Sequence, residues 1–269
     1  MLISKLKENA PLVHCITNYV TVTDCANGLL AVGASPIMAD EISEAADIVK
    51  ICNALLLNIG TANERTAASM LAAGQAANQK GIPVLLDPVG VGASAFRRCL
   101  VDKIMKEVKL TAIRGNASEL RVLVQGQCGI SRGVDVGLDD LITPQNMEQT
   151  ADNLCKFSRQ TGAAVSLSGA IDIIADGQSA VALFNGHEQM TRLTGCGCVL
   201  SAISAAFLAV ASPAEGLRAA ASLWAVCGEL AYRQTQDQGL GAYHTALFNN
   251  LGLLDDKTVD GREKYEKLR

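Results

Sequence analysis

The segment Thr194-Gly195-Cys196-Gly197-Cys198 precedes a long apolar stretch and combines two glycines with two cysteines. Glycine lets backbone N–H groups approach a ligand without an obstructing Cβ atom. A helix N-terminus offers free N–H donors and a partial positive charge. The segment therefore favours an anion-binding site, although an ordinary glycine-rich start of a helix explains it equally well. It has no lysine, so it is not the G-x-x-x-x-G-K-[ST] phosphate loop.

Cys198 is expected in the first turn of this helix. A free thiol titrates near a pH of about 8.5, and a helix N-terminus lowers that value. Cys198 is therefore a candidate to accept the proton of a hydroxyl group, or only to position that group. The alternative is a small buried residue, which describes most cysteines.

Two further polar positions follow apolar runs. Asp87 ends the run that begins at Ile82, and a carboxylate at the carboxyl end of a parallel strand faces the usual ligand crevice of an α/β sheet. Arg114 ends another run and is suited to binding phosphate. The stretch Asn116–Glu119 has the spacing of a capping box, and Glu119 could also help to hold Mg²⁺, directly or through water.

Near the N-terminus, residues 14–18 end an apolar run in polar side chains. His14 is expected to be a core histidine with its hydrogen bonds satisfied, rather than a base. Met38 could line an apolar ligand pocket, although a lone methionine more commonly belongs to the core. The acidic residues at 40, 41 and 44 are expected to form a solvated face.

The elements that position these residues alternate along the chain. Continuous apolar runs indicate strands covered on both faces, and the amphipathic stretches between them indicate helices. The expected strands are 12–16, 54–59, 84–87, 111–114 and 165–168, and the expected helices are 61–80, 95–107, 116–125, 146–161, 198–211 and 213–234. This order predicts a three-layer α/β/α fold with a mostly parallel central sheet. Runs 171–175 and 179–184 flank Asp176-Gly177 and predict an antiparallel hairpin at one edge.

No linker rich in proline, glycine or serine divides the chain, so one domain over residues 1–269 is expected, with an excursion loop over 129–144. The lysine-rich end after Leu254 is expected to be a frayed or packed-down tail. No basic face suggests nucleic acid, and no apolar stretch reaches the roughly 18 residues of a spanning helix, so no membrane partner is expected. Nine scattered cysteines favour a reducing cytoplasm over a disulfide framework.

Seven motifs, in this order, make the sequence resemble the hydroxyethylthiazole kinase family. They are Pro11–Asn18, Gly33–Met38, Asn58–Thr61, Asp87–Ala93, Ile113–Glu119, Arg132–Asp135 and Thr194–Cys198. The resemblance implies a ribokinase-like fold and transfer of phosphate from ATP, with Mg²⁺, to the hydroxyl of 4-methyl-5-(2-hydroxyethyl)thiazole in thiamine salvage. It also implies a homotrimer with substrate sites between subunits.

The resemblance further implies roles for individual residues. These are thiazole contacts for Met38 and Gly195 with Asn18 nearby, ATP contacts for Arg114 and Ser168, Mg²⁺ organisation by Asp87 and Glu119, and an anion hole formed by Gly195, Cys196, Gly197 and Cys198. Cys198 stands where sugar kinases of the fold carry an aspartate base.

Three departures from the family pattern bear on activity: Cys196 replaces a usual Thr, Ser168 replaces another Thr, and Ala170 replaces a usual Glu. Ala170 puts part of the nucleotide or metal contacts in doubt. The alternatives are therefore a ribokinase-like kinase of another small alcohol, a hydrate dehydratase of the same fold, or a non-catalytic adenine-nucleotide-binding oligomer. A dehydrogenase ranks far behind, because no G-x-G-x-x-G follows an early strand.

Overall fold

The computed structural model describes residues 2–126 and 141–269. Most of the expected excursion loop 129–144, the Arg132–Asp135 motif and Cys128 lie outside the described residues. Within them, nine strands form one sheet in the order β2-β1-β3-β4-β5-β6-β7-β8-β9. The strands are β1 Leu12–Ile16, β2 Ser35–Ile37, β3 Ala54–Asn58, β4 Val84–Asp87, β5 Ala112–Asn116, β6 Ala164–Ser168, β7 Asp172–Ala175, β8 Ala180–Leu183 and β9 Tyr265–Lys267.

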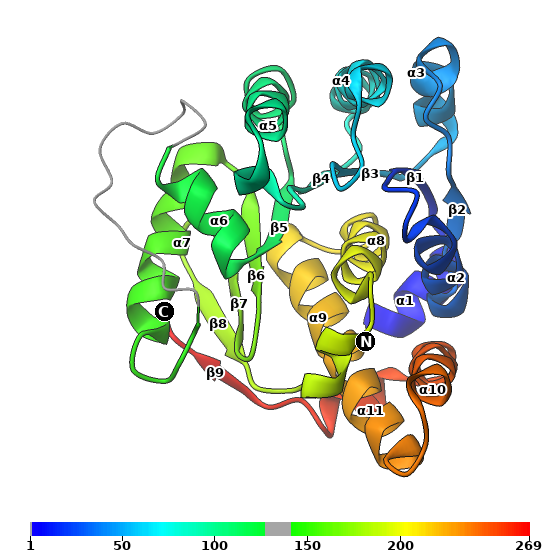
Figure 1. Cartoon of the computed structure of the whole chain (residues 1–269), viewed down its shortest axis with the longest axis vertical. Coiled ribbons are helices and arrows are strands. Elements are labelled where there is room, and N and C mark those ends of the chain that lie inside the picture. Colours follow the sequence, from blue (N-terminus) through cyan, green and yellow to red (C-terminus); the bar gives the residue numbers. More distant parts are fainter. Residues whose placement is uncertain (1, 127–140) are drawn as a thin grey trace.

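Strands β1 to β6 are parallel to their neighbours, and β7, β8 and β9 continue the sheet in antiparallel pairing. Helices cover both faces of the sheet (Figure 1). One face carries α1 Leu2–Asn9, α2 Val22–Val32, α8 Cys196–Leu208, α9 Pro213–Thr235, α10 Leu240–Leu253 and α11 Asp256–Asp260. The other carries α3 Ile42–Ile51, α4 Glu64–Lys80, α5 Ala95–Glu107, α6 Ala117–Val124 and α7 Met147–Thr161. The expected three-layer α/β/α architecture is confirmed.

Alternation along each strand explains why the apolar runs are continuous. In β3, Ala54 and Leu56 face the core under α8, whereas Leu55 and Leu57 face the opposite core. Successive Cβ atoms of a strand point to opposite faces of the sheet. A strand covered on both faces therefore needs apolar residues at every position.

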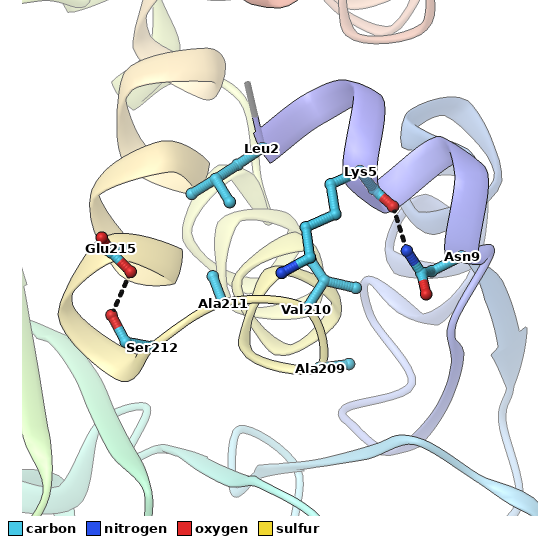
Figure 2. A pocket seen from close by; sticks show the side chains of 8 residues that line it. All are labelled: Leu2, Lys5, Asn9, Ala209, Val210, Ala211, Ser212 and Glu215. Carbon is cyan, nitrogen blue, oxygen red and sulfur yellow. Dashed lines mark hydrogen bonds between the residues drawn. The ribbon is translucent and has the colours of Figure 1, made fainter.

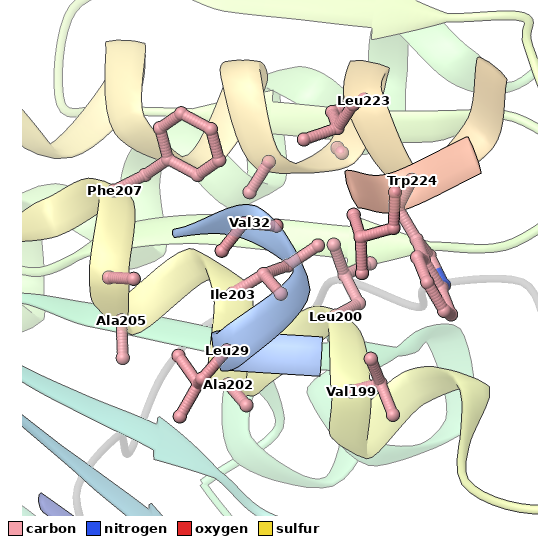
Figure 3. Close-up of a cluster of buried hydrophobic side chains, with 14 of the residues drawn as sticks. Leu29, Val32, Val199, Leu200, Ala202, Ile203, Ala205, Phe207, Leu223 and Trp224 are labelled. Atoms are coloured by element: carbon pink, nitrogen blue, oxygen red, sulfur yellow. The ribbon is translucent and has the colours of Figure 1, made fainter. Parts of the chain in front are cut away.

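Helix α8 lies in the centre of one layer and is buried from Cys198 to Leu208. Figure 3 shows its Ile203 and Phe207 side chains among those of α2 and α9, including Leu29 and Trp224. Fully burying one such side chain contributes roughly 1.5–3 kcal/mol. This packing fixes the N-terminal end of α8, and with it the Gly195–Cys198 segment, relative to the sheet.

Several element boundaries differ from those expected. Helix α8 begins at Cys196, two residues before the expected start, and α4 begins at Glu64 because Asn63 caps it. Strand β2 was not expected from the sequence. The end of the chain is packed down: α11 follows Leu254, and β9 pairs with β8. The expected hairpin around Asp176-Gly177 is confirmed as β7–β8.

Candidate active site

The polar residues that follow the parallel strands meet at one edge of the sheet. Because parallel strands share a direction, their carboxyl ends lie together. The strand order places Met38 after β2, Asn18 after β1, Asn58 at the end of β3, Asp87 at the end of β4, Asn116 at the end of β5 and Ser168 at the end of β6. The start of α8 lies at the same edge, since a hydrogen bond joins Cys198 to Asn18.

Asp87 is the most deeply buried acidic side chain of this edge, with no exposed surface. Its Oδ2 accepts a hydrogen bond of 2.7 Å from Nδ2 of Asn58, the residue paired with it in the sheet register. Its Oδ1 is buried and has no hydrogen-bond partner among the described residues. Burial raises the pKa of Asp87 to about 7, and the nearby Arg114 guanidinium opposes that rise. A buried carboxylate with one free oxygen is a group that a cation would satisfy.

The amide of Asn58 joins Asp87 to a second group of side chains. Its Oδ1 accepts hydrogen bonds from Gly60 N and from Nδ2 of Asn18. Asn18 Nδ2 also lies 3.2 Å from the sulfur of Cys198, and its Oδ1 accepts bonds from the backbone and hydroxyl of Thr21. The carbonyl and amide ends of Asn18 and Asn58 are thereby fixed, and a chain of contacts runs from Cys198 to Asp87.

The expectation that the start of α8 lowers the pKa of Cys198 is wrong. The residue does lie in the first turn of the helix, but burial raises its pKa, and the charge of Asp87 raises it further. Hydrogen bonds from neighbouring side chains, Asn18 among them, act in the opposite direction. The thiol is therefore neutral near pH 7 and suited to hydrogen bonding with a hydroxyl group.

Neither glycine of the segment leaves room for a Cβ atom unless a neighbouring side chain moves. Gly195 caps α8 at φ +89°, and a Cβ atom there would lie 2.5 Å from the Thr21 methyl group. At Gly197, a Cβ atom would lie 2.5 Å from Nη1 of Arg114. The guanidinium of Arg114 thus lies against the first turn of α8, where free N–H donors also point. Between these glycines, Cys196 is half-buried, and burial raises its pKa to about 12.

Arg114 and Ser168 are brought together. The buried Arg114 donates through Nη2 to the Ser168 hydroxyl, and its Nε has no partner among the described residues. Ala170, two residues beyond Ser168, is exposed. Asp172 lies two residues beyond Ala170 and accepts a 2.8 Å hydrogen bond from Gly169 N. Burial raises the pKa of Asp172 to about 6, and this hydrogen bond and the charge of Arg114 act in the opposite direction. A carboxylate is therefore present close to where Ala170 lacks one.

Glu119 forms the expected capping box with Asn116, which is confirmed at both of its bonds. Its Oε2 accepts from Asn116 N and its Oε1 from Gly90 N. Both oxygens are therefore already engaged, and Glu119 fits a role toward Mg²⁺ through water better than direct ligation.

The donors present fit Mg²⁺ that arrives with a nucleotide. In residues 2–126 and 141–269 no three acidic, histidine or cysteine side chains form a metal cluster. Mg²⁺ commonly uses one or two carboxylates together with waters and substrate phosphates. The free Oδ1 of Asp87 supplies one such oxygen.

Three further residues of the N-terminal part were considered in the sequence: His14, Met38 and Asp40. His14 is fully buried, with Nε2 2.8 Å from the Ala39 carbonyl oxygen, and burial lowers its pKa. It is therefore a core histidine as expected, but its Nδ1 has no hydrogen-bond partner among the described residues, so it is not fully satisfied. Met38 is half-buried, at the same edge of the sheet, and packs against the core that contains α8. Asp40 is half-exposed and forms an ion pair with Arg65.

Sequence reasoning gave Asn58 no role in this site, although Asn58 begins one of the seven motifs, and it missed Thr21 and Asp172. Asn58 had a usable signal, because it ends an apolar run as Asp87 does. Thr21 and Asp172 had none, since their contacts come from segments far along the chain or from turn geometry.

A pocket at the far end of α8 does not include these residues. It is lined by Leu2, Lys5, Asn9, Ala209, Val210, Ala211, Ser212 and Glu215 (Figure 2). Two of its polar side chains form local hydrogen bonds: Asn9 donates to the Lys5 carbonyl, and Ser212 donates to Glu215. The length of α8, about 20 Å at 1.5 Å per residue, separates it from Cys196.

Two further observations concern all of the described residues. In the described ranges, no helix is both long and apolar enough to cross a bilayer. The cysteines of these ranges are all free.

Comparisons with known proteins agree with one another. A model of the hydroxyethylthiazole kinase family matches residues 3–257. The hydroxyethylthiazole kinase of Clostridium acetobutylicum is 46% identical over 267 residues, which cover 98% of this chain and 97% of that relative.

Solved structures extend the comparison. The structure of a hydroxyethylthiazole kinase protein from Pyrococcus horikoshii is similar with a TM-score of 0.89 and 30% identity, covering 100% of this chain and 98% of that one. A ribokinase-like superfamily protein from Enterococcus faecalis is similar with a TM-score of 0.63 and 16% identity over 91% of this chain and 88% of its own. At that identity the likeness concerns the fold, which is ribokinase-like.

Proposed function

The chain belongs to the hydroxyethylthiazole kinase family, and from this membership we propose that its edge site transfers the γ-phosphate of ATP to the hydroxyl of hydroxyethylthiazole. The reaction serves thiamine salvage. The observation that carries this proposal for the site is the chain of contacts from Cys198 through Asn18 and Asn58 to Asp87. It links groups suited to an alcohol with a buried carboxylate suited to the Mg²⁺ that accompanies ATP.

The alcohol is proposed to lie toward β1 and β2. Met38 supplies a half-buried apolar surface there, and Gly195 leaves the space a side chain would fill. Asn18 and Cys198 then lie beside the hydroxyl. In phosphoryl transfer through a loose transition state, positioning and charge neutralisation matter more than deprotonation by a base. A neutral Cys198 thiol that orients the hydroxyl is sufficient.

The nucleotide is proposed to lie toward β5 and β6. Arg114 and Ser168 are joined to each other at this end, and the Arg114 guanidinium rests against Gly197. The phosphates then face both a cation and the free N–H groups of Gly195 to Cys198, the proposed anion hole. Mg²⁺, when bound with ATP, supplies neutralisation of the phosphate charge. Asp87 is proposed to hold it by Oδ1, and Glu119 through water.

The proposal extends to the domain organisation, the oligomeric state and the cellular compartment. We propose that residues 1–269 form one catalytic domain and that it assembles as a homotrimer with sites between subunits, which sedimentation equilibrium would test. The free cysteines of the described ranges support a reducing cytoplasm as its compartment.

The direct test is ADP release with Mg-ATP and hydroxyethylthiazole, compared with a no-alcohol control and a panel of other vitamin-precursor and sugar alcohols. We expect release that depends on hydroxyethylthiazole. ADP release with another alcohol alone would mean that the chain is a kinase with a different substrate. ATP binding without release for any alcohol would favour a non-catalytic nucleotide binder, and Ala170→Glu would then be the first variant to make.

A further inference from the structure

Arg97 is a cation with no role in the site as described so far. It lies in the first turn of α5, a turn that contains no acidic residue. A positive charge at a helix N-terminus is unfavourable toward the helix dipole. The position therefore gains nothing from the charge of Arg97 through its own helix, and the reason for that charge lies in its other contacts.

The guanidinium of Arg97 joins two loops at the edge of the sheet. Its Nη2 donates to the carbonyl oxygen of Gly60 at 2.5 Å, and its Nη1 donates to that of Val89 at 2.5 Å. Gly60 follows β3, and Val89 follows β4. Gly90 makes room for this fork, because a Cβ atom there would lie 2.7 Å from Nη1 of Arg97.

The other bonds that the described residues show between these loops lie where the strands end, and they include the bond from the Asn58 side chain to Asp87. The paired register of β3 and β4 ends at Asn58 and Asp87, and one more backbone bond follows, from Ile59 N to the Asp87 carbonyl. Beyond it, the fork of Arg97 is the next tie between the loops. A planar guanidinium suits this task, because its donors are fixed in a fork, which an ammonium group lacks.

Each loop contacts residues of one side of the proposed reaction. Gly60 donates to Asn58 Oδ1, and a Cβ atom on Gly60 would lie 3.0 Å from the Cβ of Asn18. Val89 precedes Gly90, whose N–H donates to Glu119, and follows Asp87 by two residues. The distance between the alcohol side and the phosphate side therefore depends on how the two loops are held.

We infer that Arg97 is a positioning residue that sets the Gly60 loop, which supports Asn18 on the alcohol side, against the Val89 loop, which follows Asp87 on the metal side. This inference rests on the proposed function. Arg97 acts through backbone carbonyls and touches neither substrate. Its neighbour Arg98 provides a matched control, since it lies on the same turn, is also half-buried, and donates to a single carbonyl, that of Gly92.

The experiment compares Arg97→Met, Arg97→Lys and Arg98→Met with the wild-type chain in steady-state kinetics with Mg-ATP and hydroxyethylthiazole. A displacement of about 1 Å costs on the order of 100-fold in rate. We expect kcat to fall by about 10- to 100-fold in Arg97→Met, less in Arg97→Lys, and less than about twofold in Arg98→Met. The dissociation constant of hydroxyethylthiazole, measured without nucleotide, should change by less than about threefold, because the loss is in the transition state.

Hydrogen exchange of the peptides over residues 58–63 and 87–93 adds a readout that needs no turnover. Exchange should become faster in both peptides of Arg97→Met, whereas Arg98→Met should leave the 58–63 peptide unchanged, because Arg98 contacts only Gly92 in the other peptide. A wild-type chain without thiazole turnover would refute the proposed function, and the exchange comparison would still decide the role of Arg97. Unchanged exchange and kcat in Arg97→Met, or equal losses in Arg98→Met, would overturn the inference. If Arg97→Met does not fold, Arg97→Lys carries the same comparisons.

Discussion

Substitution of Gly197 by alanine should separate stability from activity. Gly197 is the second residue of α8, and a Cβ atom there would lie 2.5 Å from Nη1 and 3.1 Å from Nη2 of Arg114. Real Cβ contacts do not occur at that distance, so the guanidinium must move. It cannot move freely, because Arg114 is buried and bonded to Ser168.

The magnitude follows from what the guanidinium is proposed to do. A hydrogen bond to a charged group contributes about 1.5–3 kcal/mol. Loss of one phosphate contact of this kind corresponds to a fall of about 10- to 100-fold in kcat/KM for ATP, at about 1.4 kcal/mol for each factor of ten. Alanine is a better helix former than glycine by up to about 1 kcal/mol. The free energy of unfolding should therefore stay within about 1 kcal/mol of wild type while activity falls.

Gly241→Ala is the matched control. Gly241 is likewise the second residue of its helix, α10, and a Cβ atom there meets nothing within 4 Å. It should give the same gain in helix propensity with wild-type kinetics. The assay is steady-state ADP release with ATP varied, alongside urea unfolding of both variants. A kcat/KM for ATP within about twofold of wild type in Gly197→Ala would refute the reasoning.

A double-mutant cycle tests whether Arg114 carries the effect. If Gly197→Ala acts by displacing Arg114, the same substitution should cost little more in an Arg114→Ala background. Equal losses in both backgrounds would mean that the new methyl group obstructs the phosphates directly.

Three further predictions concern the same edge of the sheet. Burial raises the pKa of Asp87 to about 7, above its value of about 3.9 in an unfolded chain, so the native state binds the proton more tightly. The unfolding free energy of the ligand-free protein should therefore fall as pH rises from about 4 to about 7. Urea unfolding at several pH values should show a weaker fall in Asp87→Asn. An equal dependence of the unfolding free energy on pH in both proteins would contradict this prediction. Iodoacetamide near neutral pH should label the exposed Cys99 well before Cys198, as peptide mass spectrometry would show, because burial raises the pKa of Cys198. Asn58→Ala removes the 2.7 Å donor to Asp87 and should lower kcat/KM by about 10-fold or more. The control is Ser158→Ala, because Ser158 is buried and bonds to Ala163, which lies before the opposite end of β6; kinetics equal to those of the control would exclude a role for Asn58.

Much of the fold was predictable because its signals are local. The strand Val84–Asp87 and the helix Ala95–Glu107 have the bounds expected from the sequence. An apolar run between a proline and an acidic residue marks the strand, and Ser94 caps the helix. Strand β9 had no such signal, since its three residues are all exposed and its partner β8 lies about eighty residues earlier in the chain.

The site was predictable in its parts but less so in its connections. The capping box of Asn116 and Glu119 depends on a spacing of three residues and was readable. The pairing of Asn58 with Asp87 depends on the register of two strands, which no local pattern fixes. The contact of Arg97 with Gly60 joins residues 37 positions apart and depends on how α5 is placed. Connections of this kind require the tertiary structure.

Cys198 shows how a correct local argument can be overruled by packing. The dipole at a helix N-terminus favours an anion by about 0.3–1 kcal/mol, and by up to about 2 kcal/mol in partly buried cases. Burial of an ionisable group shifts its pKa by up to about 3–5 units against the charged form, which is the larger effect. Cys198 is buried in the hydrophobic core around α8 and also lies near Asp87, so both burial and a like charge oppose the thiolate. A neutral thiol beside bound ATP can hold a hydroxyl in line, and it does not itself compete as a nucleophile for the phosphate.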